Sequence, residues 1–301
     1  GNVQMAKTIS SLQKDFRNQL SKLRKLTQPY FLPYTESNGW VFIFLLVAML
    51  FCVAGIVLVL LTALMSLFGS LSANLTNQYL GGVTNSLEQI WSGKIGLSIS
   101  FLFLLGISSF IAVRGQLRQK RWVPWLILGL IILMLLSVNG INAGITFLVR
   151  DITNALIEKN EDASYRNLWI LGICFITALP IRSLQFYLTE KLQLLWRDWL
   201  SKSLINDYLT DQTYYILNPN EELETNVDNP DQRITEDTRD FTQQALDLAL
   251  NIFDSVLTFS LNILILISIS RELTIALICY ASIITFLLVF ASKKLFRLNY
   301  D

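Results

Sequence analysis

Two aspartates in the last quarter of the chain are the residues best placed to carry chemistry. Asp247 and Asp254 lie seven residues apart, about two turns of a helix, so both would face the same way. They stand at the beginning of an apolar run that continues to residue 270. Ionisable side chains within a membrane segment are costly, and they mark proton relays or contacts for polar substrates. The pair is a candidate for either role; the alternatives are that it lies at the water boundary or pairs with Arg182.

Further polar side chains interrupt the apolar runs. Arg182 and Gln185 lie in one run, Asn139 and Asn142 in another, and Asn262 in a third. In lipid such groups need a partner or a water-filled cavity. The residues that we predict to line a cavity are Arg182, Gln185, Asp247, Asp254 and Asn262.

Several chemistries are excluded by residues that the sequence lacks. It contains no histidine, which excludes imidazole metal ligands and a histidine general base. Cys52, Cys174 and Cys279 each lie within an apolar run without metal-ligand spacing, and we interpret them as small buried hydrophobic residues. The net charge of +1 gives no reason to expect a nucleic-acid partner. We predict no catalytic, cofactor-binding or metal-binding residue, and the chain by itself is not expected to be an enzyme.

The elements that must position the polar residues are long apolar helices. Hydrophobic residues make up 52% of the chain and charged residues 16%, and the mean hydropathy is +0.46. Apolar runs of about 18 or more residues predict transmembrane helices, because barrel strands would alternate instead. The predicted spans are 40–68, 96–113, 123–149, 168–188, 252–270 and 273–291. The predicted fold class is therefore all-α, a polytopic membrane protein with about six transmembrane helices.

Basic residues near the span ends predict which side of the membrane each loop occupies. They gather before the first span, in the loop "RGQLRQKR" after the second, and after the sixth. With six spans these three segments share one side, which the positive-inside rule makes the cytoplasm. The prediction is a multi-pass protein of the plasma (inner) membrane with a cytoplasmic N-terminus. The acid-rich segment 189–251 falls on the same side, where acidic residues weigh little in the rule.

Residues 1–39 are predicted to form an amphipathic segment on the inner leaflet. Leu12, Phe16, Leu20 and Leu23 recur at helical spacing with basic residues between them. Pro29 is expected to end this helix. A disordered basic tail is the alternative.

Two helices are predicted to continue well beyond the bilayer. After the fourth span an apolar stripe continues among charged residues as far as residue 205. The stretch "DNPDQ" (228–232) suits a helix start, with an Asp or Asn to cap and a proline at the first helical position. From Pro230 the helical pattern runs into the fifth span, a helix of roughly 40 residues and about 60 Å. The bilayer core takes only about 30 Å of this length. The charged stretch is thus predicted to lie outside the lipid, in a projecting helical hairpin.

Four segments of the sequence resemble one family of membrane proteins. "NPDQRITEDTRDF" (229–241) is similar to the signature of ABC-transporter permeases related to the peroxisomal fatty-acyl (ABCD-like) transporters, whose bacterial branch includes the SbmA/BacA-type peptide and cobalamin uptake proteins. The other three segments occur in the order found in that family. They are "QPYFLPYTESNGW" (28–40), "RDITNALIEKNEDASYRNL" (150–168) and "FYLTEKLQLLWRDWLSKSLINDYLTDQTYY" (186–215).

The resemblance implies an architecture and partners. The last four predicted spans would be the first four helices of a type-1 exporter-like permease with long cytoplasmic helix extensions. The turn before Pro230 would lie near the segment that contacts an ATP-binding domain, and a second permease copy in the membrane lipid would complete a homodimer. Residues 1–39 would be the cytoplasmic segment, 40–122 an extra transmembrane hairpin with a basic linker, and 123–301 a partial ABC transmembrane domain. The implied coupling residues are Asn229, Pro230, Asp231, Gln232, Arg233, Glu236 and Asp237.

The sequence also departs from that family. The last two core helices and the ATPase domain are absent, and no G-x-x-x-x-G-K-[ST] motif occurs. The chain is therefore expected to be a fragment or to work with a separate ATP-binding chain, with ATP and Mg²⁺ held by that domain. The expected function is ATP-driven transport of a peptide-like, cobalamin-like or lipidic substrate. The alternatives are a proton-coupled peptide uptake permease of the same fold and a membrane scaffold.

Overall fold

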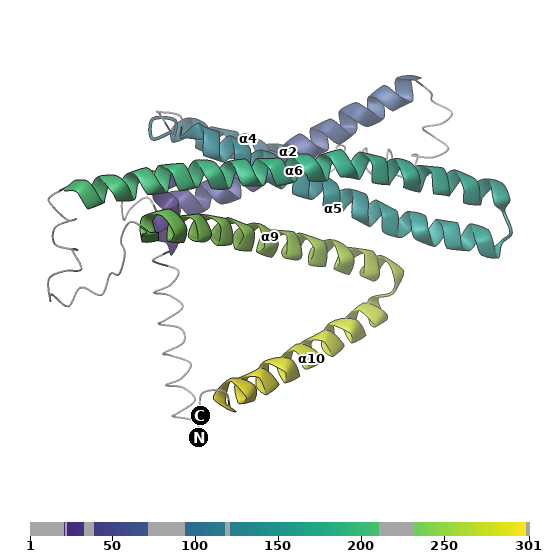
Figure 1. Cartoon of the computed structure of the whole chain (residues 1–301). Coiled ribbons are helices and arrows are strands. Elements are labelled where there is room, and N and C mark those ends of the chain that lie inside the picture. The colour runs from purple at the N-terminus through teal and green to yellow at the C-terminus, as the bar shows by residue number, and fades with distance from the viewer. Residues whose placement is uncertain are drawn as a thin grey trace. The chain divides into compact units, whose positions relative to one another are not determined.

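The described part of the protein consists of long helices, and two pairs of consecutive helices are joined by short turns at residues 158–160 and 270 (Figure 1). The computed structural model describes residues 21, 23–32, 39–71, 94–117, 121–210 and 232–298. Within these ranges no residue lies in a strand. The prediction of an all-α membrane fold is confirmed.

Each predicted span corresponds to a helix, and most helices are longer than the apolar run that identified them. Lipid cannot satisfy backbone polar groups, so a spanning segment must be helical throughout its length. The helices are α2 (Gly39–Leu71), α4 (Lys94–Ala112), α5 (Trp122–Ile157), α6 (Glu161–Leu209), η3 (Arg233–Asp237), α9 (Thr238–Ile269) and α10 (Arg271–Leu298).

Five of these helices, as far as the structure describes them, are long and apolar enough to cross a membrane. They are α2, α5, α6, α10 and the helix formed by η3 together with α9. The remaining apolar helix, α4, is the shortest of the predicted spans, and its apolar part is described over Leu97–Ala112. A full crossing takes about 20 residues, so α4 stands at the lower limit.

The predicted continuation of two helices beyond their apolar parts is confirmed. Helix α6 runs for 49 residues and contains Pro180 without a break. In the next described part of the chain, the five π-helical residues of η3 lead directly into the 32 residues of α9. The predicted start at Pro230 lies outside the described residues.

Local hydrogen bonds fix the two turns between the core helices. At the α5–α6 turn, Lys159 adopts a left-handed conformation with φ 54, and the Asn160 side chain accepts a hydrogen bond of 3.1 Å from the Ala163 amide. At the α9–α10 turn, the Ser270 hydroxyl accepts from the Leu273 amide at 3.4 Å. Both Asn160 and Ser270 therefore act as caps for the helix that follows.

The chain divides into two compact units. The first comprises Gly1–Ser137 and Pro180–Leu246, and the second comprises Val138–Leu179 and Asp247–Asp301. The best-buried apolar side chains of the first unit come from four different segments and form its core. They are Leu32, Leu45, Ile131 and Leu192.

Helices α2 and α4 of the first unit pack against each other. The contact is close because glycine faces it: a Cβ added to Gly106 would come within 2.8 Å of the Ala48 carbonyl oxygen. Small residues allow such an approach in membrane helices, where dispersion contacts replace the hydrophobic effect. The predicted extra hairpin is therefore packed as a pair.

In the second unit, α9 and α10 diverge from their turn (Figure 1). Large apolar side chains of α10, including Tyr280, Ile283 and Leu287, are exposed along this helix. Such a surface is suited to hydrocarbon rather than to water.

One expectation about the N-terminal segment is wrong. Residues 23–31 are helical, so the helix does not end at Pro29. The Leu32 amide donates to the Gln28 carbonyl at 2.7 Å, which carries the last turn past the proline. A proline removes only its own amide donor, and the following amides remain free to continue the helix. The rest of the predicted amphipathic helix lies mostly outside the described residues, and the domain boundaries at 39 and 122 stay predictions.

Candidate functional site

A polar contact joins two membrane-spanning helices within the second unit. The Asn139 side-chain amide on α5 donates to Asp254 Oδ1 on α9 at 2.7 Å. One turn further along α9, the Thr258 hydroxyl donates to Asn139 Oδ1 at 2.7 Å. One asparagine thus uses its donor and its acceptor on the same neighbouring helix.

The surroundings of this contact make it a candidate site. Asn139 is buried and Asp254 is half-buried, although both belong to apolar helices. A carboxylate in such a place needs hydrogen bonds to compensate for the loss of water. Asp254 meets this need at Oδ1 through the Asn139 amide.

The other residues predicted to line a cavity lie in different surroundings. Asp247 is half-buried near the beginning of the same face of α9, and it too has an interaction partner. Arg182 is exposed on α6, and its guanidinium donates to Gln185 Oε1 at 3.3 Å, one turn away on the same helix. The role of these residues stays a prediction.

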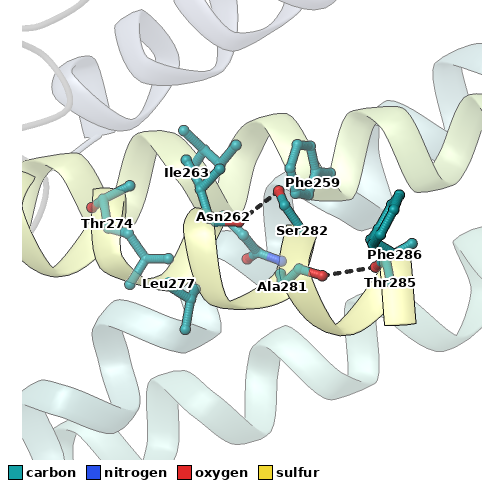
Figure 2. Close-up of a pocket in the computed structure, with 11 residues that line it drawn as sticks. Phe259, Asn262, Ile263, Thr274, Leu277, Ala281, Ser282, Thr285 and Phe286 are labelled. Atoms are coloured by element: carbon teal, nitrogen blue, oxygen red, sulfur yellow. Dashed lines mark hydrogen bonds between the residues drawn. The ribbon is translucent and has the colours of Figure 1, made fainter. Parts of the chain in front are cut away.

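Asn262 lies in a groove between α9 and α10 (Figure 2). The groove has a volume of roughly 750 Å³ and a mostly apolar lining. Figure 2 shows Asn262 and Phe259 of α9 among Ala281, Ser282 and Phe286 of α10. The hydroxyls of the groove bond to their own helix, as Ser282 does to the Ile278 carbonyl at 2.7 Å. The Asn262 amide is thus the main polar group that the groove offers to an occupant.

In the first unit, the polar ends of α6 and α9 are joined directly. The hydroxyls of Ser201 and Thr238 lie 3.2 Å apart. The rings of Trp196 and Phe241 meet edge to face, with their centroids 5.6 Å apart. The two helices are therefore fixed to each other beyond the segments that suit lipid.

The predicted coupling residues that the structure describes are Gln232, which precedes η3, and three residues of η3, directly before α9. Gln232 and Arg233 bond to Glu236 and Asp237 respectively, one turn further on, at 3.0 and 3.4 Å. All four side chains are exposed. They are available to a partner; Asn229, Pro230 and Asp231 lie outside the described residues.

Sequence reasoning missed a group of residues before α2 that contact the later helices. Residues 23–32, called here the entry segment, contact α5 and α6. Tyr30 lies between Trp196 and Trp199, with ring centroids 6.1 Å and 5.7 Å away. Burial raises the pKa of the Tyr30 hydroxyl, and the nearby carboxylate of Asp198 raises it further. The available signal was the pairing of aromatics in "QPYF" with the two tryptophans of α6.

The comparisons with known proteins identify the membrane region. A family model described as "ABC transporter transmembrane region 2" matches residues 113–301. An uncharacterized ABC transporter ATP-binding protein of Synechocystis sp. is 36% identical over 281 residues, which cover 91% of this chain and 41% of that protein. The chloroplastic ABC transporter D family member 2 of Arabidopsis thaliana is 33% identical over 165 residues, 55% of this chain and 23% of that protein.

A third relative is the inner membrane ABC transporter ATP-binding protein YddA of Escherichia coli K12. It is 31% identical over 144 residues, 46% of this chain and 25% of that protein. No solved structure matches the chain.

The chain spans less than half the length of these relatives. The matched region begins at the end of α4 and contains α5, α6, η3, α9 and α10, which include the intramembrane contact and the joined polar ends. The protein is a multi-pass membrane protein, and its chain belongs to the ABC transporter transmembrane region 2 family.

Proposed function

We propose that this chain is the membrane-spanning part of an ATP-driven transporter. In this proposal α6 and α9 transmit a movement of an ATP-binding domain outside the bilayer to the segments of these helices within it. The observation that supports it most directly is the direct contact of the polar ends of these helices through Ser201 and Thr238. To transmit movement, a helix must be rigid both within the lipid and beyond it. The contact between α6 and α9 stiffens the two helices where they extend beyond their apolar parts.

The length of α6 fits such a role. Its 49 residues correspond to about 74 Å at 1.5 Å per residue. The hydrocarbon core occupies only about 30 Å. The remainder is a helical rod with charged side chains such as Lys202 and Asp198, which bond to each other at 2.7 Å on its exposed surface. A helix segment with charged side chains is costly in lipid and is suited to contact with a soluble domain.

The ATP-binding domain is the partner that the relatives suggest. They carry the name ATP-binding protein and are more than twice the length that this chain covers. ATP and Mg²⁺ would be held by that domain, on the same polypeptide or on another. The exposed residues at η3, namely Gln232 directly before it and Arg233, Glu236 and Asp237 within it, would contact that domain.

The proposal includes an orientation and an assembly. Basic residues before α2, after α4 and near the end of α10 support a cytoplasmic position for these ends, and the name of the bacterial relative supports the inner membrane. A second copy would complete the substrate pathway. Asp254, Asp247 and Asn262 on α9, with Arg182 and Gln185 on α6, would line that pathway and contact a peptide-like, cobalamin-like or lipidic substrate.

The test reconstitutes the protein with its ATP-binding domain in proteoliposomes. Accumulation of a fluorescent peptide, of cobalamin and of a fluorescent fatty acid is measured with and without ATP. The double variant Glu236→Lys with Asp237→Lys should lower ATP-dependent accumulation about tenfold or more, since charges at a docking face govern association. The matched control reverses Glu161 and Asp162, an exposed acidic pair at the opposite end of α6, and should leave transport unchanged.

Other outcomes would favour the other functions. Uptake that continues without ATP but stops with a protonophore, and is abolished by Asp247→Asn, would indicate a proton-coupled permease. Disruption of a protein complex by Arg233→Glu, with no movement of any of the three probes, would indicate a scaffold. Either result would exclude the ATP-driven proposal.

A further inference from the structure

The entry segment, residues 23–32, links three helices of the first unit through a continuous series of aromatic rings. Phe31 meets Trp125 of α5 edge to face at 5.3 Å. The neighbouring Tyr30 stacks on Trp196 of α6, with an interplanar angle of 18°. Trp196 in turn meets Phe241 of α9 at 5.6 Å. Each such pair contributes to stability beyond the area that it buries.

Two backbone carbonyls hold this segment in place. The Arg121 guanidinium donates to the Pro29 carbonyl at 2.9 Å, and the Trp125 indole donates to the Phe31 carbonyl at 3.3 Å. Both donors stand at the beginning of α5, so they fix the segment on each side of Tyr30. Tyr30 itself is only 8% exposed.

The docking also carries a local cost. The Gln28 side chain is fully buried, and neither Nε2 nor Oε1 has a hydrogen-bond partner among the described residues. The indole nitrogen of Trp196 is likewise buried without a hydrogen-bond partner among the described residues. Buried polar groups of this kind oppose burial, whereas apolar groups of the same shape do not. The docking is thus a balance between aromatic contacts and buried polar atoms, and single substitutions can shift it in either direction.

We propose that the entry segment is an intramolecular clamp that holds α6 and α9 together at their polar ends, with Tyr30 as its positioning residue. Tyr30 touches both tryptophans of α6, one of which carries the contact to α9. The Ser201–Thr238 contact lies within one or two turns of Trp196 and Phe241 on the two helices. The clamp itself rests on these contacts; only its consequence for coupling rests on the proposed function.

A core tyrosine with no such role would behave differently. Its removal would weaken the folded protein in general, so that contacts in both units would loosen alike. A clamp predicts a local change: the polar ends of α6 and α9 separate while the rest of the protein stays folded. The test therefore measures the separation of the two helices directly.

The experiment follows disulfide formation between Ser201→Cys and Thr238→Cys in membrane vesicles. Cys52, Cys174 and Cys279 are first replaced by alanine. Tyr30→Ala should slow cross-linking about tenfold because it removes both aromatic pairs with α6. Tyr30→Phe keeps the ring that makes both pairs and should cross-link within about twofold of the parent. Gln28→Met replaces the buried amide by an apolar group of similar shape and should cross-link at least as fast as the parent.

A second cysteine pair serves as the control. Asn139→Cys with Thr258→Cys reports a contact of the second unit, and Tyr30→Ala should leave its cross-linking rate unchanged. Equal losses at both pairs would mean that Tyr30 stabilises the assembly in general, and this would overturn the clamp. Unchanged cross-linking at residues 201 and 238 in Tyr30→Ala would overturn it as well. Neither readout requires ATP or transport, so the clamp can stand if the proposed function fails, and the reverse also holds.

Discussion

Asn139 and Asp254 join α5 to α9 through a hydrogen bond of 2.7 Å between two apolar helices. The contact determines which faces of the two helices meet, because a polar pair in an apolar setting has few alternative partners. Asn139 Oδ1 also accepts a hydrogen bond from the Thr258 hydroxyl, so both the nitrogen and the oxygen of its side-chain amide bond to α9. Any displacement of the Asp254 side chain would therefore act directly on α5.

The first prediction concerns the strength of this contact. Asn139→Leu removes the donor to Asp254 and the acceptor for Thr258, and should destabilise the protein by about 1–2 kcal/mol. The measurement is the midpoint of thermal unfolding in detergent micelles. Asn142→Leu is the matched control, since Asn142 lies on the same helix with an exposed side chain. If the two variants unfolded at the same temperature, the contact would be of no consequence for stability.

The extent of the membrane helices was accessible from the sequence for a clear physical reason. Lipid leaves no choice of secondary structure for an apolar run, so the break at Ser270 and the long continuation of α6 follow from composition and periodicity. The partner of Asp254 did not follow. Periodicity shows which residues share a face with Asp254 on α9, but not that Asn139 of α5 lies opposite, since helix pairing depends on the packing of the whole unit.

The entry segment shows the same limit. Pro29 was expected to end its helix because proline removes an amide donor. The Leu32 amide, three residues later, nevertheless donates to the Gln28 carbonyl and continues the helix past the proline. The burial of Tyr30 depends on Trp196 and Trp199, which lie more than 160 residues away in the sequence. A one-dimensional pattern carries no information on such a contact.

The second prediction compares one substitution at two glycines. Alanine in place of an open helical glycine stabilises the helix by about 0.5–1 kcal/mol. Gly140 of α5 has no atom within 4 Å of an added Cβ, so Gly140→Ala should raise the midpoint of unfolding. Gly106→Ala should lower the midpoint, with a loss of about 1–3 kcal/mol in the free energy of unfolding, because the Cβ would come within 2.8 Å of the Ala48 carbonyl oxygen. Changes of the same sign at both positions would argue against the close packing of α2 and α4.

The third prediction isolates a single hydrogen bond of the entry segment. Trp125→Phe keeps an aromatic ring near Phe31, Phe42 and Phe110 but removes the indole donor to the Phe31 carbonyl. The buried carbonyl then loses its partner, with an expected cost of about 1–3 kcal/mol. Trp122→Phe, one turn earlier on α5 and 54% exposed, should change the stability little. Limited proteolysis between residues 23 and 32 reports the same difference locally, and equal cleavage rates in the two variants would contradict it.

The fourth prediction concerns alkaline pH and the hydroxyl of Tyr30. Its pKa is raised in the folded protein, first by burial and then by the Asp198 carboxylate, so the folded state holds this proton more tightly than the unfolded state. The stabilisation from a buried neutral Tyr30 is therefore complete below the ordinary pKa of about 10 and is lost progressively as the pH rises above it. Near-ultraviolet absorbance of tyrosinate should show one tyrosine of the wild type that titrates above the others and is missing from Tyr30→Phe. The same variant should lose less stability than the wild type between neutral pH and pH values above about 10. Because phenylalanine cannot ionise, an identical alkaline loss in both proteins would show that Tyr30 is not the group whose deprotonation opens the contact with Trp196.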